Sequence, residues 1–237
     1  MVYAYRKVTS CSDRAFTLME LLVVISLLAL LLAMLMPNLR ASRAEARRLK
    51  CSLQLGQIGR AFHIYCDEHE SYFPWPAATR SAMVFGGRAG TYGGYRAADG
   101  YSPSSRALNQ YLGVAGNAPD DSDVLVFLCP DDGGAKAWDP NSETTYSDVG
   151  SSYAYNAWAA ATGADTLRGC KMTRVENPSL TIMAGDHPVH NYTQGGDRQQ
   201  YWHHPKRIMA NILFVDTHVD FHEVEPGLET DDYTWLP

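Results

Sequence analysis

The C-terminal part of the chain holds the densest group of side chains that could bind a metal ion. Four of them alternate along one segment: Asp216, His218, Asp220 and His222. Alternate residues of an unbroken strand share one face, and carboxylates and imidazoles are ligands that suit transition metals. Further residues of these types lie upstream: Asp186, His187, His190, His203 and His204. The alternative is that the aspartates occupy turns and the other polar residues line an exposed strand, which requires no metal.

Cysteines are the second group with chemistry to offer. The five are Cys11, Cys51, Cys66, Cys129 and Cys170, and no two form a Cys-x-x-Cys pair. Cys51 and Cys66 fall in one expected helix, where their separation would be about 22 Å, too far for a disulfide. Cys129 and Cys170 both lie in the expected globular domain and could form a disulfide, and two unpaired thiols are the alternative.

A single carboxylate interrupts the apolar N-terminal segment. From Leu18 to Met36 the only ionisable residue is Glu20. The apolar run that begins at Phe16 is about 20 residues long, enough to span a bilayer. A charge near the centre of a membrane helix costs about 2.5–3.5 kcal/mol, so an intramembrane carboxylate indicates a function. A secretory signal peptide has a shorter apolar core, and a plain signal anchor leaves Glu20 unexplained.

The stretch Arg14-Ala15-Phe16-Thr17-Leu18-Met19-Glu20 resembles the prepilin peptidase motif of type IV pilins and type II secretion pseudopilins. In that family the peptidase cuts before the phenylalanine and methylates the new amine. Counted from Phe16, Glu20 is fifth and Pro37 is twenty-second, as in the family. The resemblance implies cleavage and methylation at Ala15 and Phe16, and roles in assembly for Glu20 and Pro37. Ala15 is a departure, because the family nearly always has glycine there, and this bears on the efficiency of cleavage.

Electrostatics supports a paired role for Phe16 and Glu20. In a bundle of such helices, the Glu20 carboxylate of one subunit can neutralise the Phe16 amine of a neighbour, which offsets the cost of burying either charge. The pairing would also fix the axial register between subunits. The alternative is a capping box, because Thr17-x-x-Glu20 has the required spacing. The two roles can hold in turn, capping in the monomer and pairing in the assembly.

The apolar segment continues into an amphipathic helix. One helical stripe contains Cys51, Leu55, Ile58, Phe62 and Tyr65. We expect a helix from Phe16 to about Asp67 that continues through Pro37, with the stripe as the seam for a globular domain. A partner-binding face is the alternative use of the stripe. The expected divisions are a leader at 1–15, a transmembrane and assembly helix at 16–36, an amphipathic continuation at 37–72 and a globular head domain at 73–237.

Several segments of the head domain have strand character. They are residues 124–129, 151–156, 180–185 and 211–222. Residues 86–105, rich in Gly, Ser, Tyr and Arg, are typical of an irregular surface loop. The predicted fold class is therefore α+β, in which a long N-terminal helix, half of it transmembrane, packs on a small antiparallel sheet.

Shorter fragments are similar to a planctomycete-type group of pilin-like proteins. They are residues 51–65 with Phe73-Pro74, and residues 127–131, 153–156 and 210–219. That group carries a C-terminal His-spacer-Asp-Gly signature. Here Thr217 follows Asp216, and His203 and His204 lie further upstream than the usual spacer. The resemblance implies a hairpin with its turn near Asp216-Thr217, which would break the shared face. We therefore expect no metal site, and Asp216 and His218 are the residues that one would use.

Calcium is the alternative cofactor that the family resemblance raises, because some pseudopilins hold Ca²⁺ in a C-terminal loop. The pairs Asp131-Asp132 and Asp231-Asp232 offer carboxylate oxygens. Neither pair lies in a loop pattern such as an EF-hand. We therefore expect no cofactor.

Composition and missing motifs narrow the function further. A net charge of −6 over 237 residues argues against nucleic acid as a partner. The sequence has no Gly-rich phosphate loop, nucleophile elbow or His-Glu-x-x-His motif, so we do not expect an enzyme. The principal hypothesis is a structural subunit, single-pass in the bacterial inner membrane, with its head domain periplasmic or at the cell surface. Its expected partners are other pilin-like subunits and prepilin peptidase.

Two other hypotheses use the same membrane anchor. In one, the chain is an extracytoplasmic binding or metal-dependent protein that uses the C-terminal His/Asp cluster. In the other, it is a binding module for a surface polymer, which aromatic side chains would recognise. The tryptophans concerned are Trp75, Trp138, Trp158 and Trp202.

Overall fold

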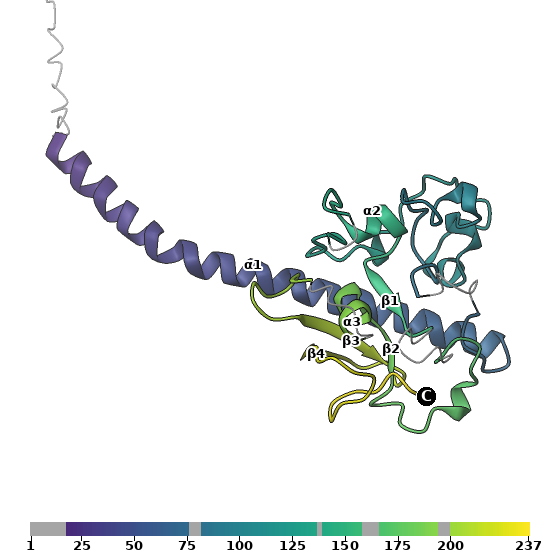
Figure 1. Ribbon diagram of the computed structural model, residues 1–237. Helices are drawn as coiled ribbons and strands as arrows, with labels where there is room; N and C mark the ends of the chain where they lie inside the picture. The colour runs from purple at the N-terminus through teal and green to yellow at the C-terminus, as the bar shows by residue number, and fades with distance from the viewer. Residues whose placement is uncertain (1–17, 76–81, 137–138, 158–165, 194–199) are drawn as a thin grey trace, which may run out of the picture. The chain divides into compact units, whose positions relative to one another are not determined.

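The computed structural model describes residues 18–75, 82–136, 139–157, 166–193 and 200–237 (Figure 1). The chain divides into two compact units, residues 1–43 and residues 44–237, and we call the second the head unit. Helix α1, Leu18–Glu68, supplies all the described residues of the first unit and is the first element of the head unit. The predicted long N-terminal helix is therefore present.

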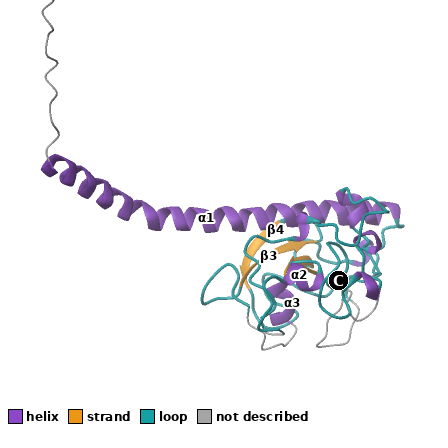
Figure 2. Cartoon of the chain, turned by 90° about the horizontal axis from the view of Figure 1, so that it is seen from above, coloured by secondary structure: helices purple, strands orange, loops and turns teal. Residues whose placement is uncertain are grey.

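Within the head unit, α1 buries one face. The buried residues are Cys51, Gln54, Leu55, Ile58, Gly59, Ala61, Phe62 and Cys66. They include all of the predicted stripe except Tyr65, which is half-buried. Gly59 lies against Leu213, where an added Cβ would come within 2.9 Å of the leucine side chain. The elements of the head unit gather along this part of the helix (Figure 2), so the stripe is the seam that the sequence predicts.

The sheet of the head unit has four antiparallel strands in the order β1-β2-β3-β4. They are β1 (Tyr153–Tyr155), β2 (Ile182–Asp186), β3 (Met209–Phe214) and β4 (Val219–Glu223). Strands β3 and β4 form a hairpin whose turn contains Thr217, at a φ of 78°. This is the hairpin that the family resemblance implies, and the antiparallel sheet confirms the α+β class.

Alternation along β3 sends side chains to both faces of the sheet. Ala210, Ile212 and Phe214 pack in a cluster that the C-terminal residues Tyr233 and Trp235 complete. Leu213 packs in the larger cluster, which includes the buried face of α1. Since alternate strand residues share a face, Asn211 is directed to the α1 side, together with Leu213.

The described residues between 82 and 150 form an irregular layer of short helical elements. These are η2 (Ala97–Asp99), η3 (Pro103–Ser105), η4 (Asn109–Leu112), η5 (Leu125–Phe127) and α2 (Thr145–Val149). The buried guanidinium of Arg106 donates hydrogen bonds to the carbonyls of Met83, Gly86 and Val149, which ties three parts of this layer together. Two further short helical elements lie after the layer, η6 (Met172–Arg174) and α3 (His187–Thr193).

Two sequence predictions for this layer are wrong. Residues 124–129 do not form a strand, because the Leu125 carbonyl accepts from Nε2 of Gln54 at 2.8 Å and the Val124 amide donates to the Tyr146 hydroxyl. The segment 86–105 is not wholly a surface loop, since residues 86, 87, 89 and 90 are buried. A Cβ at Gly87 would lie 1.9 Å from the carbonyl oxygen of Gly150, so only glycine allows this close packing.

Candidate functional site

The N-terminal candidates occupy the start of α1. Ala15 and Phe16, the predicted processing site, lie outside the described residues. Glu20 is exposed in the first turn of α1, and Pro37 lies inside the helix without ending it. The predicted continuation of the helix through Pro37 is therefore confirmed.

Apolar side chains cover the whole circumference of this part of α1. Every residue from Leu18 to Met36 is exposed, including Leu31 and Met34, both 65% exposed. Exposing an apolar surface of this kind to water is unfavourable. Lipid, or a bundle of similar helices, would cover it with other apolar groups. Among the described residues, α1 is one helix with the length and apolar composition to cross a membrane.

A second group of candidate side chains, all ionisable, lies inside the head unit around His203. The side chain of His203 is 1% exposed and lies between two carboxylates. Its Nε2 is 2.8 Å from Oδ2 of Asp186, at the end of β2, and its Nδ1 is 3.1 Å from Oδ2 of Asp131, which follows Cys129-Pro130. Asp131 also accepts a charge-assisted hydrogen bond from Nε of Arg47 on α1. Four ionisable groups from four segments are thus joined in series.

Asp186 is anchored from β3. Its Oδ2 accepts hydrogen bonds from the backbone amide of Asn211 at 2.6 Å and from Nδ2 of Asn211 at 2.9 Å. The side chain is 0% exposed, and among the described residues Oδ1 has no hydrogen-bond partner. A buried carboxylate oxygen without a donor is costly, so Oδ1 is an unsatisfied acceptor in the interior of the head unit.

The protonation of His203 follows from these neighbours. Burial lowers the pKa of the imidazole, but the charges and hydrogen bonds of Asp186 and Asp131 outweigh burial and hold the pKa above its ordinary value. The protonated ring donates one N–H to each carboxylate, which is the state that the two distances favour.

The disulfide of the head unit joins Cys51 and Cys129, with their Cα atoms 5.1 Å apart. The possible pair of Cys129 and Cys170 that the sequence offered is therefore wrong, and Cys66 and Cys170 are free thiols. The physical reason is the seam, because Cys51 begins the buried stripe of α1 and faces the irregular layer that holds Cys129. Burial raises the pKa of the Cys66 thiol to about 12 and also raises that of Cys170, so neither is a ready nucleophile.

The C-terminal His/Asp candidates do not form one site. Asp216 and His218 lie in the hairpin turn, whereas Asp220 and His222 lie on β4. Asp216 and His218 contact each other, with side chains 39% and 44% exposed. The aspartate thus accepts from the backbone and side chain of the residue two positions later, a common turn arrangement that requires no metal.

Of the aspartates that could supply oxygens to calcium, Asp131 and Asp132 follow Cys129 and have other partners. Asp132 accepts hydrogen bonds from the amides of Gly134, Thr145 and Tyr146 and from the Ser152 hydroxyl. Burial raises the pKa of this carboxyl, and the four donors partly offset the rise. Asp132 therefore positions the loop after Cys129.

The tryptophans do not make a common surface among the described residues. Trp75 is 63% exposed, stacks with the Arg168 guanidinium at 4.6 Å from the ring and lines a cavity of about 530 Å³ together with Tyr65 and Tyr72. Trp202 instead packs against the larger core cluster. Trp138 and Trp158 lie outside the described residues.

The residues that the structure brings together differ from those that the sequence singled out. The sequence marked Asp186 and His203 only as two of several upstream residues that could bind a metal ion. It marked Asp131 only as a carboxylate that could bind calcium. Arg47 and Asn211 have no signal in the sequence. One signal was available, because Asp186 ends a short segment that is otherwise free of charged residues and has strand character, and a charge buried in that position must find a partner inside the fold.

The family model described as "Prokaryotic N-terminal methylation motif" matches residues 11–36. With the apolar helix, the match supports a type IV pilin-like family and a membrane-anchored chain with a prepilin-type N-terminus. No curated protein and no solved structure matches the chain.

Proposed function

We propose that the chain is a structural subunit of a type IV pilus-like filament or a type II secretion pseudopilus, and that it is not an enzyme. Prepilin peptidase removes residues 1–15 and methylates the amine of Phe16. The observation that carries the proposal is the combination of the methylation motif at residues 11–36 with an apolar helix that contains one carboxylate, Glu20.

Assembly through Glu20 follows from the cost of burying a charge. A carboxylate within lipid is unfavourable alone, but it is stabilised when the amine of a neighbouring subunit lies beside it. Apolar helices of several subunits pack together through their exposed Leu, Val and Ile side chains, and the ion pair sets their register. Pro37 marks the point at which the assembly helix leaves the apolar core.

We also propose the location of each part. The chain crosses the inner membrane once, and the head unit lies in the periplasm or at the cell surface. The Cys51–Cys129 disulfide supports this orientation, because disulfides persist in oxidising compartments outside the cytoplasm. We further infer that the chain belongs to the planctomycete-type group that its head fragments resemble, with other pilin-like subunits as its partners.

The first experiment is intact-mass and N-terminal analysis of the chain extracted from membranes. The proposal requires a mature chain that begins with a methylated Phe16. A chain that still begins at Met1, or that has lost residues beyond Pro37, would contradict it.

The second experiment replaces the carboxylate. Glu20→Val should abolish filament assembly, measured by shearing and sedimentation, while the head unit keeps its thermal unfolding profile. Glu45→Gln is the matched control, because Glu45 is an exposed carboxylate on the same helix that pairs locally with Arg48. Normal assembly of Glu20→Val would show that the carboxylate has no role between subunits.

A further inference from the structure

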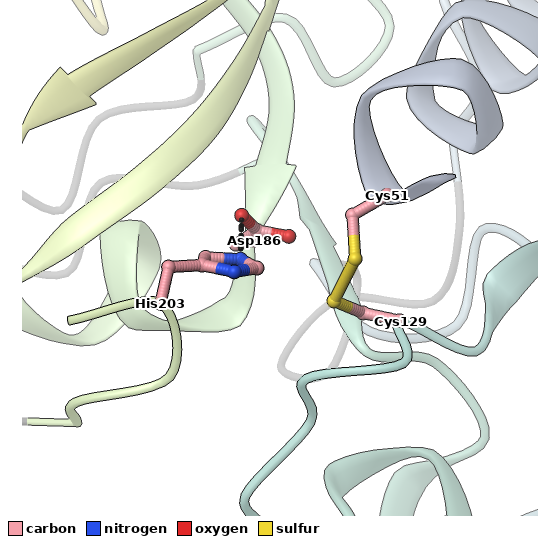
Figure 3. Close-up of side chains that lie close together, drawn as sticks. All are labelled: Cys51, Cys129, Asp186 and His203. Carbon is pink, nitrogen blue, oxygen red and sulfur yellow. Dashed lines mark hydrogen bonds and ion pairs between the residues drawn. A yellow bond between two sulfur atoms is a disulfide. The ribbon is translucent and has the colours of Figure 1, made fainter. Parts of the chain in front are cut away.

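Four metal-ligating side chains meet in the interior of the head unit. They are Cys51 from α1, Cys129 after η5, Asp186 at the end of β2 and His203 before β3 (Figure 3). One ligand atom of each lies within 4.8 Å of all the others. The four segments are far apart in the sequence, so only the fold assembles this group.

The set of atoms suits one metal in particular. Two thiolates, an imidazole nitrogen and a carboxylate oxygen are the ligands that Zn²⁺ takes in tetrahedral protein sites. Bond lengths of about 2.0–2.3 Å place the ligand atoms of such a site roughly 3.3–3.8 Å apart. Movements of about an ångström would therefore bring the present group into that geometry.

Neighbouring side chains orient the two non-sulfur ligands, as the groups around the ligands of a metal site do. Nδ1 of His203 is held by Asp131, and Asp131 by Arg47, while Nε2 lies 2.8 Å from Oδ2 of Asp186, inside the group of four side chains. A carboxylate that orients a ligating histidine in this way is typical of zinc sites. Oδ2 of Asp186 is held by Asn211, just as a ligating carboxylate is held by its own donors.

An independent observation also indicates a ligand. Oδ1 of Asp186 is fully buried and has no hydrogen-bond partner among the described residues. Figure 3 shows this carboxylate with one oxygen toward the imidazole and the other on the side of the two sulfur atoms. Because one ligand atom of each of the four side chains lies within 4.8 Å of the others, a cation among them would satisfy Oδ1.

We propose that the head unit, when the Cys51–Cys129 bond is reduced, binds one Zn²⁺ through Cys51, Cys129, His203 and Asp186. The disulfide and the zinc centre are then alternative forms of one cross-link between α1, the irregular layer and the sheet. The inference does not depend on filament assembly, because all four ligands lie within residues 44–237.

The chemistry balances with a dithiol as the reductant. One thiolate of the dithiol attacks a sulfur of the disulfide, and its second thiolate then releases the protein thiol, so two electrons pass to the protein and the reductant becomes a disulfide. Zn²⁺ displaces the two thiol protons and the proton that Nε2 of His203 donates to Asp186, while Nδ1 keeps its proton. The newly made chain reaches the same dithiol form before its first oxidation.

The first test uses the full chain in detergent micelles, with Cys11→Ser to remove the leader thiol. One sample is reduced with a phosphine and another is left oxidised, and both are incubated with Zn²⁺ and freed of excess metal. We expect one zinc per reduced chain and none per oxidised chain by elemental mass spectrometry. A reduced chain without zinc, or equal zinc in both samples, would overturn the proposal.

The second test replaces Zn²⁺ with Co²⁺, whose absorption reports its ligands. The reduced chain should give the intense visible bands of tetrahedral Co²⁺ and a thiolate charge-transfer band in the near ultraviolet. Both should disappear in Cys51→Ser and Cys129→Ser, and both should remain in the matched controls Cys66→Ala and Cys170→Ala. Loss of the bands in the controls, or their persistence in Cys51→Ser, would assign the metal to other thiols and contradict the proposal.

The third test grades the remaining ligands by zinc affinity. His203→Gln and Asp186→Asn should each weaken binding by at least about 100-fold, Asp131→Asn by roughly 10–100-fold, and His218→Asn not at all. Circular dichroism of the oxidised variants shows whether each one folds. For a variant that does not fold, the zinc stoichiometry and Co²⁺ spectrum of the parent chain decide the question. Unchanged affinity in folded His203→Gln would exclude the site.

Discussion

The two halves of α1 differ in what surrounds them. From Leu18 to Arg47 every residue is exposed, and as far as Met36 nearly all are apolar. From Arg48 to Glu68 the helix is amphipathic, and Leu55 and Ile58 are 0% exposed. A helix that is apolar on all sides needs an apolar solvent, whereas a helix with one apolar stripe needs one packed neighbour. The two halves of one continuous helix therefore have surfaces that suit two different environments.

The largest expected effect comes from separating these environments. A chain that begins at Ala44 should move completely from the membrane fraction to the soluble fraction, since the exposed apolar surface is then gone. Its thermal unfolding should match that of the head unit in the whole chain in detergent. A fragment that aggregates or melts early would mean that the first half of α1 also stabilises the head unit.

The next effect tests the covalent link between the second half of α1 and the irregular layer. Replacing both Cys51 and Cys129 with alanine removes the disulfide that closes a loop, with a sequence separation of 78. The loss should lower the free energy of unfolding by about 4 kcal/mol. Chemical denaturation of the oxidised proteins measures it. Cys170→Ala is the control, and it should cost much less because Cys170 forms no cross-link. An equal loss of unfolding free energy in the two variants would mean that the disulfide does not stabilise the head unit more than an unpaired cysteine does.

A smaller effect compares two leucines on the packed half. Leu55→Ala should cost about 2–5 kcal/mol, because Leu55 is 0% exposed and a cavity would remain. Leu53→Ala should stay within about 0.5 kcal/mol, because Leu53 is 69% exposed. Urea unfolding of the head unit measures both. Similar costs at the two positions would contradict the assignment of the buried face.

The smallest effect compares two glycines on the same half. Gly56→Ala should stabilise the protein by about 0.5–1 kcal/mol, because alanine favours the helix and a Cβ there meets nothing within 4 Å. Gly59→Ala should lose that gain, because its Cβ would press on Leu213. Differential scanning calorimetry resolves the two melting temperatures. A higher melting temperature for both variants would mean that the contact at Gly59 relaxes freely.

The helix and the strands could be predicted from the sequence because their patterns are local. The stripe from Cys51 to Phe62 repeats with the helical period, and the strands β2 and β3 are mostly apolar. The run at 124–129 has the same composition, but its backbone bonds to side chains of Gln54 and Tyr146 instead of to a strand. Composition cannot reveal which partner a backbone group will find.

The buried site was harder to predict because its contacts are long-range. Cys51 pairs with Cys129 across the seam, whereas the sequence offered Cys170 as the possible partner of Cys129 because both lie in the expected globular domain. The series of hydrogen bonds from Arg47 through Asp131 and His203 to Asp186 joins four segments that share no motif. By contrast, the N-terminal motif is contiguous, so seven adjacent residues are enough to identify it.

The position of the disulfide has a mechanical consequence if the proposed filament bears load. Tension applied through the first half of α1 would reach Cys51 and pass directly to Cys129 through the sulfur atoms. Residues 52–128 would then lie outside the path of the force and would bear no load. The seam between α1 and the sheet could not be peeled apart from its N-terminal end, and a pulled subunit would extend only before Cys51 and beyond Cys129.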